Sequence, residues 1–395
     1  MEKDLQGGSG WSRERVAVAA YFAVLGLVCA TWASSIDDMK LLLGLDESQQ
    51  GWLLFSGPLG NLVSFTFASA LVTRLGSRRS VILATCAYFA AALSLGLCFM
   101  LKAPVPFWCV AIAALGGTGN VVNISVNTQG GIVERTAGRS IMNSFHAMFS
   151  VTSLAAGLLA LAAAACGVPV HVRLFGVLAL AGLVHLVFFR GLPAENDVAP
   201  PERDGRWRRP DGAHFLLGLA ALVIMGCEGS ISDWVSVFYR EALAAPPERV
   251  KWGFCAVCAA MTFGRFVNDR LINRYGAVRV LRASCVLVAA GLGIALAAPW
   301  SGLSGLALHL LATVGYAVAG LGISSLAPIL YSKANRTKSM PAASAVTFIG
   351  SMGFLGYFIG PPMIGHVAHA TCLSLALGIF AVLILACLFL RLGRD

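Results

Sequence analysis

The stretch 73–79 reads Thr-Arg-Leu-Gly-Ser-Arg-Arg, and the stretch 273–279 reads Asn-Arg-Tyr-Gly-Ala-Val-Arg. Each follows one apolar run and precedes another, and a glycine at its centre permits a tight turn. A repeat at half the chain length indicates a membrane protein built from two related bundles of helices. The residues that recur after two hundred positions are Arg74 and Arg274, Gly76 and Gly276, and Arg79 and Arg279.

The composition of the whole chain also indicates a membrane protein. Of the 395 residues, 57% are hydrophobic and 12% are charged, and the mean hydropathy is +0.77. A soluble domain carries about 25% charged residues, so this chain does not have an ordinary solvated exterior. Apolar runs of about 20 residues are long enough for a helix to cross a membrane. Helices are expected there because they satisfy their own backbone hydrogen bonds in lipid.

We therefore predict an all-α integral membrane protein with twelve transmembrane helices in two pseudo-symmetric six-helix bundles. The first span is too long for a signal peptide and has acidic as well as basic flanks, so we interpret it as a retained helix. The expected spans are 16–35, 50–72, 80–101, 105–131, 140–165, 170–190, 213–239, 250–270, 278–298, 303–330, 341–365 and 369–391.

The positive charges are sorted by side of the membrane. With the N-terminus in the cytoplasm, these spans place twenty-two of the 29 Lys and Arg residues in cytoplasmic segments and six on the opposite side. The positive-inside rule then predicts an inner-membrane protein with both termini in the cytoplasm. The chain divides into a tail (1–15), a first bundle (16–190), a polar linker (191–212) and a second bundle (213–395). The net charge of +10 does not indicate nucleic-acid binding, because no basic face carries base-reading groups.

Polar side chains within spans are costly and mark candidate functional groups. Asn120, Asn123 and Asn127 share one face of the fourth span. Carboxamides both donate and accept hydrogen bonds, which suits a neutral polyhydroxyl or heterocyclic solute; hydrogen bonding between packed helices is the alternative. In the fifth span, Asn143 and His146 share another polar face. Histidine titrates near neutrality, so His146 is a candidate proton carrier or gate, with a purely structural donor as the alternative.

The seventh span carries the strongest single candidate, Glu228. It lies about 22 Å into the span, where a carboxylate is expensive, so we expect proton exchange or solute contact; a permanent ion pair is the alternative. Ser232 shares its face, and Tyr316 in the tenth span is a further predicted solute contact. Asp233 lies on another face near the outer boundary, beside Trp234, which we expect in the aromatic belt; a functional role for Asp233 and simple solvation are both open.

Two further sequence elements and the cysteines complete the set of candidate residues. Arg265 and Asp269 are spaced as an intrahelical pair. In the eleventh span, the sequence Gly360-Pro361-Pro362 predicts a break in the helix and a hinge, because proline lacks a backbone donor. The eleven cysteines lie in or beside apolar spans and are expected to pack as small hydrophobes. We expect no metal site and no cofactor.

Twelve spans, a long central loop and a repeated R-x-G-x-x-R loop resemble the major facilitator superfamily over the whole chain. The resemblance implies two bundles that rock about a central site, and a gate between the bundles at Arg265 and Asp269. The superfamily usually has Asp where this chain has Thr73 and Asn273, so the charge relay that locks the outward-open state is expected to be weak. Segments similar to a bacterial branch related to the fucose permease are 116–123 with Asn127, 143–146 with Ser150, 228–229 with 233–234, 264–265 with 269–270, and 360–362.

The sequence thus predicts a secondary transporter that moves a small, sugar-like polar solute by alternating access, coupled to protons because titratable groups lie in the spans. No G-x-x-x-x-G-K-[ST] motif occurs, so ATP is not the direct driver. An exporter of drugs or amphipathic metabolites is one alternative, and a non-transporting solute sensor is another. A membrane-embedded enzyme would need converging catalytic groups that the sequence does not show. We expect a monomer whose partners are the solute, protons and membrane lipid.

Overall fold

A computed structural model describes residues 12–137, 141–194, 210–336 and 342–389. Within these ranges the chain is helical and has no strand. The first half contains α1 (Arg13–Ala33), α2 (Ile36–Leu43), α3 (Glu47–Leu75), α4 (Ser77–Leu101), α5 (Val105–Ala137), α6 (Met142–Ala165), α7 (Val170–Phe188) and η1 (Phe189–Gly191). The second half contains α8 (Gly212–Glu241), α9 (Trp252–Tyr275), α10 (Ala277–Ala297), η2 (Ala298–Trp300), α11 (Gly305–Arg336), α12 (Ala342–Ala370), α13 (Leu373–Ala386) and η3 (Cys387–Phe389).

The twelve predicted spans are confirmed as α1 and α3 to α13, and α2 is a short additional helix. Among the described residues, nine helical segments are long and apolar enough to cross a membrane. The helices α3 and α9 fall outside that group, and α13 with η3 forms a shorter apolar helix. Polar residues on α3 and α9 explain their lower hydropathy, because these two helices face the other bundle.

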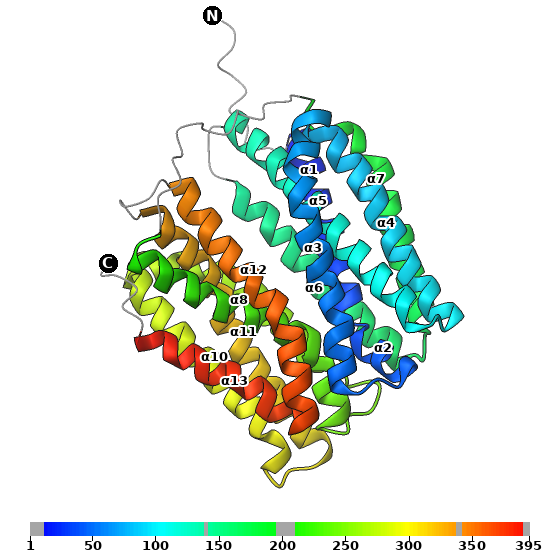
Figure 1. Cartoon of the computed structure of the whole chain (residues 1–395), viewed down its shortest axis with the longest axis vertical. Helices are drawn as coiled ribbons and strands as arrows, with labels where there is room; N and C mark the ends of the chain where they lie inside the picture. Colours follow the sequence, from blue (N-terminus) through cyan, green and yellow to red (C-terminus); the bar gives the residue numbers. More distant parts are fainter. Residues whose placement is uncertain (1–11, 138–140, 195–209, 337–341, 390–395) are drawn as a thin grey trace, which may run out of the picture.

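The two halves of the chain form two bundles with the same internal packing. In the first bundle, α1 packs on α6, α3 on α5, and α4 on α5 and α7; in the second, α8 packs on α12, α9 on α11, and α10 on α11 and α13. The ribbons of the bundles converge at the end that carries α2, which we call the α2 end (Figure 1). They diverge toward the terminal end, where α1 begins and α13 ends (Figure 1).

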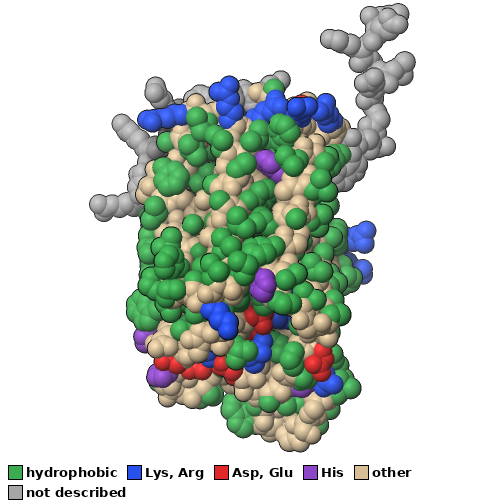
Figure 2. Space-filling model, turned by 90° about the vertical axis from the view of Figure 1, so that its right-hand side faces the viewer, with side chains coloured by type: hydrophobic (Ala, Val, Ile, Leu, Met, Phe, Trp, Pro, Cys, Tyr) green, Lys and Arg blue, Asp and Glu red, His purple; other side chains and the backbone are tan. Residues whose placement is uncertain are grey.

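The surface shows why these helices lie in a membrane. Large apolar side chains such as Val110, Leu186 and Val382 are about 70% exposed, which is favourable only against lipid. In Figure 2, hydrophobic side chains cover the middle of the molecule, and many Lys and Arg side chains gather at the terminal end. Acidic, basic and histidine side chains lie together near the α2 end (Figure 2).

The repeated glycines stand at equivalent tight turns. Gly76 joins α3 to α4 with φ 80°, and Gly276 joins α9 to α10 with φ 85°. A side chain at such a φ would clash with the backbone, whereas glycine adopts it readily. The sequence repeat therefore corresponds to a structural requirement at the same place in both bundles.

Glycines in α3 and α5 let these two helices pack backbone to backbone. A Cβ added at Gly60 would lie 1.9 Å from the carbonyl oxygen of Ala113, and one at Gly116 would lie 2.3 Å from that of Gly57. Small residues at such positions are typical of helix packing in membranes.

Two expectations about segments need comment. The predicted break at Gly360-Pro361-Pro362 is wrong, because α12 is a continuous helix through all three residues. A helix in a protein interior tolerates proline where neighbouring helices support the freed backbone, so the hinge itself stays a prediction. The tail 1–15 and the linker 191–212 lie largely outside the described residues.

Candidate functional site

A cavity of about 550 Å³ lies between the two bundles. Its lining comes from α1, α3, α4, α5 and α6 of the first bundle and from α8, α9 and α12 of the second. This volume is in the range of small-molecule sites. Its polar lining side chains are Asn61, Tyr88, Asn120, Asn123, Ser150 and Ser153 on one side, and Glu228, Ser232, Asp233, Thr262, Arg265 and Tyr357 on the other.

The carboxamides of α5 fall into different positions. Asn120 and Asn123 line the cavity, and Asn120 donates a hydrogen bond of 2.8 Å to Ser64 Oγ on α3. Asn127 is not a lining residue; its Nδ2 donates to the backbone oxygen and to Oδ1 of Asn123, at 2.8 and 2.9 Å. Asn127 thus holds the Asn123 side chain in place. Asn61 on α3 also lines the cavity, and sequence reasoning missed it because it is an isolated polar residue without a periodic partner.

Two carboxylates of α8 reach the same cavity. Glu228, Ser232 and Asp233 all line it, and the Ser232 hydroxyl donates to the backbone oxygen of Glu228 at 3.0 Å. Within the described part of the chain, neither carboxylate has a hydrogen-bond or ion-pair partner. A bound solute or a proton would offset their charge.

The expectation for Trp234 is wrong, and of the two alternatives for Asp233 the structure disfavours simple solvation. Trp234 is fully buried, so it is not in an aromatic belt at the lipid boundary. Asp233 lines the cavity and is not simply solvated at the outer surface. The cavity lining includes residues from more than one face of α8, and a single helical stripe does not describe such a helix.

Arg265 joins the two bundles. Its guanidinium donates to Ser150 Oγ on α6, and the Thr262 hydroxyl donates to the Ser150 backbone oxygen at 3.4 Å. Arg265 also lies close enough to Glu228 and His146 to act on both electrostatically. The Asp269 side chain is outside the described residues, so its pairing with Arg265 stays a prediction.

The remaining predicted groups lie around the cavity or away from it. His146 is exposed and packs edge to face on Phe22, with ring centroids 5.0 Å apart, but it is not a lining residue. Tyr316 is fully buried within the second bundle, 6.0 Å from Phe238 and 6.1 Å from Tyr239 between ring centroids, and does not reach the cavity. The Asn143 side chain is outside the described residues.

A network of ion pairs joins the bundles at the α2 end. The fully buried Asp37 accepts hydrogen bonds from Arg240 and Lys251 of the second bundle. Asp38 pairs with the same two cations, at 3.1 and 3.0 Å, and with Arg173 of its own bundle at 3.7 Å. Removing one partner of such a buried set leaves an uncompensated charge, which is strongly destabilising. We call these five residues the α2 latch.

Two further ion pairs, both made by Lys40, lie at the same end of the molecule as the α2 latch. Lys40 pairs with Glu241 of the second bundle and, at 3.0 Å, with Glu47 of its own bundle. Sequence reasoning missed the whole network because it counted these cations only as topology signals. The available signal was the presence of acidic residues after the first span and of cations after the seventh, on the same side of the membrane.

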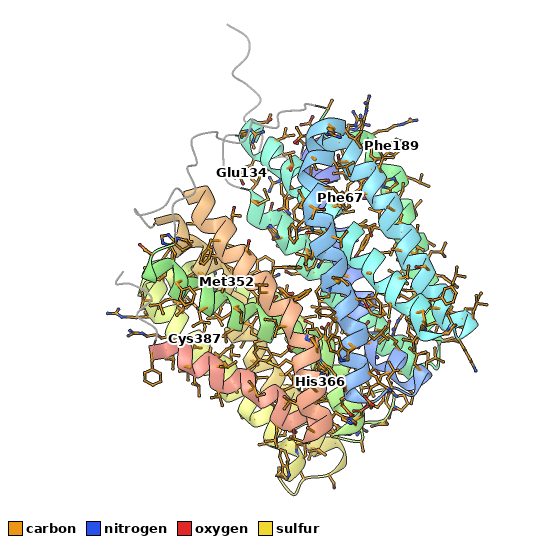
Figure 3. All side chains as sticks on the ribbon, in the orientation of Figure 1. Phe67, Glu134, Phe189, Met352, His366 and Cys387 are labelled. Carbon is orange, nitrogen blue, oxygen red and sulfur yellow. The ribbon has the colours of Figure 1, made fainter. Side chains whose placement is uncertain are left out.

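Helix packing closes the cavity further on the same side. The Phe55 ring of α3 lies 4.4 Å from the Phe358 ring of α12, and a Cβ at Gly51 would lie 2.6 Å from the Pro361 carbonyl oxygen. His366, at the α2 end of α12 (Figure 3), contacts the Trp52 ring of α3 at 5.6 Å. Glu134 lies at the opposite, terminal end of α5 (Figure 3). The Gly-Pro element of α12 thus forms part of the interface with α3.

Comparison with known proteins agrees with this architecture. The sequence profile of the Major Facilitator Superfamily matches residues 16–361. An uncharacterised MFS-type transporter of Yersinia pestis is 29% identical over 378 residues, which cover 94% of this chain and 93% of that protein. An uncharacterised transporter of Sinorhizobium fredii is 28% identical, with 93% and 95% covered, and the membrane protein MosC of Rhizobium meliloti is 28% identical, with 91% and 85% covered.

Among solved structures, two crystal structures of the nucleoside transporter NupG share the fold. A point mutant of NupG superposes with a TM-score of 0.76 over 95% of this chain and 98% of NupG, at 15% sequence identity. A second NupG structure has a TM-score of 0.72 over 96% and 99%, also at 15% identity.

Proposed function

The chain belongs to the Major Facilitator Superfamily, and from this premise we propose that it moves a small polar solute across the inner membrane by alternating access coupled to protons. Its relatives and its fold make it a multi-pass membrane transporter of small solutes and not an enzyme. The observation that carries the proposal is the cavity between the bundles, which combines carboxamides with carboxylates that lack a partner. Such a site binds a solute from both bundles at once, as a rocking mechanism requires.

The orientation follows from the charges. Many Lys and Arg residues gather at the terminal end, and by the positive-inside rule this supports the proposed cytoplasmic position of that end. The α2 latch then lies on the outer side, and the structure corresponds to a state closed to the outside. Reporter fusions after Asp211 and at Asp395 should both give a cytoplasmic signal, and an external signal from either would refute this orientation.

The solute class is proposed as sugar-like or a related metabolite. Asn61, Asn120 and Asn123 offer donors and acceptors on one side of the cavity, which suits hydroxyl groups and heterocyclic nitrogens. The fold neighbour NupG is described as a nucleoside transporter, and a nucleoside combines these two kinds of group. Glu228 is the proposed proton carrier, and His146 is the competing one.

The test is uptake by proteoliposomes that contain the purified protein. Radiolabelled sugars and nucleosides should accumulate when a pH gradient is imposed, and a protonophore should abolish the accumulation. Uptake of apolar drugs without uptake of polar solutes would favour an exporter of amphipathic compounds. Binding of a solute without any flux would favour a sensor and refute transport.

A further inference from the structure

We infer that the transported solute carries a protonated amine, and that Asp233 binds this amine in the cavity. This inference rests on the proposed transport function and specifies the chemistry of its solute. It starts from a difference between the two carboxylates of α8, which share the cavity but not their electrostatic surroundings.

Glu228 has a cation nearby, whereas Asp233 does not. Arg265 acts on Glu228 electrostatically, but within the described residues no cationic side chain acts in this way on Asp233. The next cations at the α2 end, Arg240 and Lys251, are both engaged by Asp37. The charge of Asp233 is therefore the one that the protein itself leaves uncompensated.

The position of Asp233 on the cavity wall makes a ligand cation the natural partner. Asp233 lines the space between the bundles and lies close enough to Cys29 of α1 to influence it electrostatically. It thus faces the first bundle across the cavity. A carboxylate withdrawn from water without a partner is costly, and an ammonium group placed there forms a strong, charge-assisted hydrogen bond.

The rest of the wall suits the same kind of solute. Aromatic rings of Tyr88, Phe254 and Tyr357 line the cavity, and aromatic faces attract an ammonium group by cation–π interaction. The carboxamides of Asn61 and Asn120 lie on the first-bundle side, where they bind hydroxyl groups. Two carboxylates against one guanidinium disfavour an anionic solute. The chemical class is therefore a hydroxylated amine, such as an amino sugar or an amino polyol.

The test compares matched solutes on the purified full-length protein by thermal shift, because a ligand of the folded state raises the melting temperature. The hexose set is glucose, glucosamine and glucuronate, and the hexitol set is sorbitol, glucamine and gluconate. Tetraphenylphosphonium supplies a cation without hydroxyl groups. We expect the amines to stabilise the protein more than their neutral partners and the acids to have no effect.

The matched variants are Asp233→Asn and Glu248→Gln, since Glu248 is an exposed carboxylate away from the cavity. The Asp233→Asn change should weaken amine binding about ten- to hundredfold, and more than it weakens the binding of neutral solutes, while Glu248→Gln should change neither. Asp233→Ser replaces Asp233→Asn if the latter does not fold, and Asp233→Glu should keep the preference for amines.

Several outcomes would overturn the inference. Neutral or acidic solutes that bind as tightly as the amines would contradict it. A preference for amines that survives Asp233→Asn but is lost in Glu228→Gln would also contradict it. Stabilisation by tetraphenylphosphonium alone would show a site for apolar cations. If no amine binds, the inference about the amine is refuted, and uptake of neutral solutes by proteoliposomes then tests the proposed transport function. Uptake would support transport, and no uptake would refute transport as well.

Discussion

At the scale of single residues, Glu228 and Asn123 are the residues through which we propose that the fold acts on protons and on the solute. Glu228 reaches the cavity from α8, and Asn123 reaches it from α5, on opposite sides of the same space. Each side chain has a neighbour that acts on it. The Asn123 side chain is oriented by Asn127, and Glu228 lies within the electrostatic reach of Arg265, so each acts through a neighbour.

The first prediction is that Glu228→Gln uncouples transport from protons. The amide keeps the shape of the side chain but does not titrate, so exchange of solute should persist while accumulation driven by a pH gradient is lost. Uptake and counterflow in proteoliposomes measure the two separately. His146→Gln is measured beside it, because His146 also lies near Arg265. Full gradient-driven uptake by Glu228→Gln, with loss in His146→Gln, would move the proton role to α6.

The second prediction is that Asn127→Ala weakens solute binding indirectly. Loss of its hydrogen bonds frees the Asn123 side chain, and one hydrogen bond of about 0.5–1.5 kcal/mol corresponds to roughly two- to tenfold in affinity. The thermal shift at increasing solute concentration gives the affinity. Asn123→Ala should have at least the same effect, and the double variant should be no worse than Asn123→Ala. Additive effects would show that Asn127 contacts the solute itself.

At the scale of helices, the close packing of α3 on α5 fixes the shape of the first bundle. Gly60 and Gly116 bring the two backbones together, and the same two helices carry Asn61 and Asn120 into the cavity. Positioning of the polar groups therefore depends on residues that have no functional group of their own. The interface between α12 of the second bundle and α3 also depends on a glycine, because Gly51 lets the α3 backbone approach Pro361 closely.

The third prediction is that Gly60→Val destabilises the protein, whereas Gly176→Val does not. A side chain at Gly60 would collide with the Ala113 backbone, while nothing lies within 4 Å of a Cβ at Gly176 on α7. Overpacking costs about 1–3 kcal/mol or more, so Gly60→Val should lower the melting temperature by several degrees and reduce the folded yield. Fluorescence-detected size exclusion after heating measures both variants. Equal stability of the two would contradict the packing argument.

At the scale of the whole molecule, the two bundles are held together at the α2 end by charges as well as by apolar contacts. The α2 latch joins Asp37 to Arg240 and Lys251 across the bundle boundary. In the proposed alternating-access cycle, with the α2 end on the outer side, these ion pairs would separate when the outer side opens. The α2 latch thus contributes to the free-energy difference between the two end states, which sets their populations.

The fourth prediction is that Asp37→Asn shifts the protein toward the outward-open state. The variant leaves Arg240 and Lys251 with one carboxylate fewer, which destabilises the closed arrangement. A cysteine at Asn123, in a background with Cys29 and Cys258 replaced by Ala, should react several times faster with an impermeant thiol reagent added from outside. The exposed Glu248→Gln variant serves as the control. An unchanged labelling rate in Asp37→Asn would show that the α2 latch does not set the equilibrium.

The features that the sequence determined by itself are those that depend on local chemistry. Apolar runs long enough to cross a membrane have to be helices there, so the nine long apolar helical segments of the described residues follow from composition and length. Gly76 and Gly276 mark their turns because a positive φ favours glycine wherever it occurs.

The tertiary structure decided which side chains meet. The helical period shows that Glu228 and Asp233 lie on different faces of α8, but only the packing of the two bundles around the cavity brings both side chains to one space. The same packing turns Tyr316 into the interior of the second bundle and leaves it outside the cavity. Asp37 and Lys251 are more than two hundred residues apart, and their ion pair exists because the two bundles close at the α2 end, which no pattern within either bundle specifies.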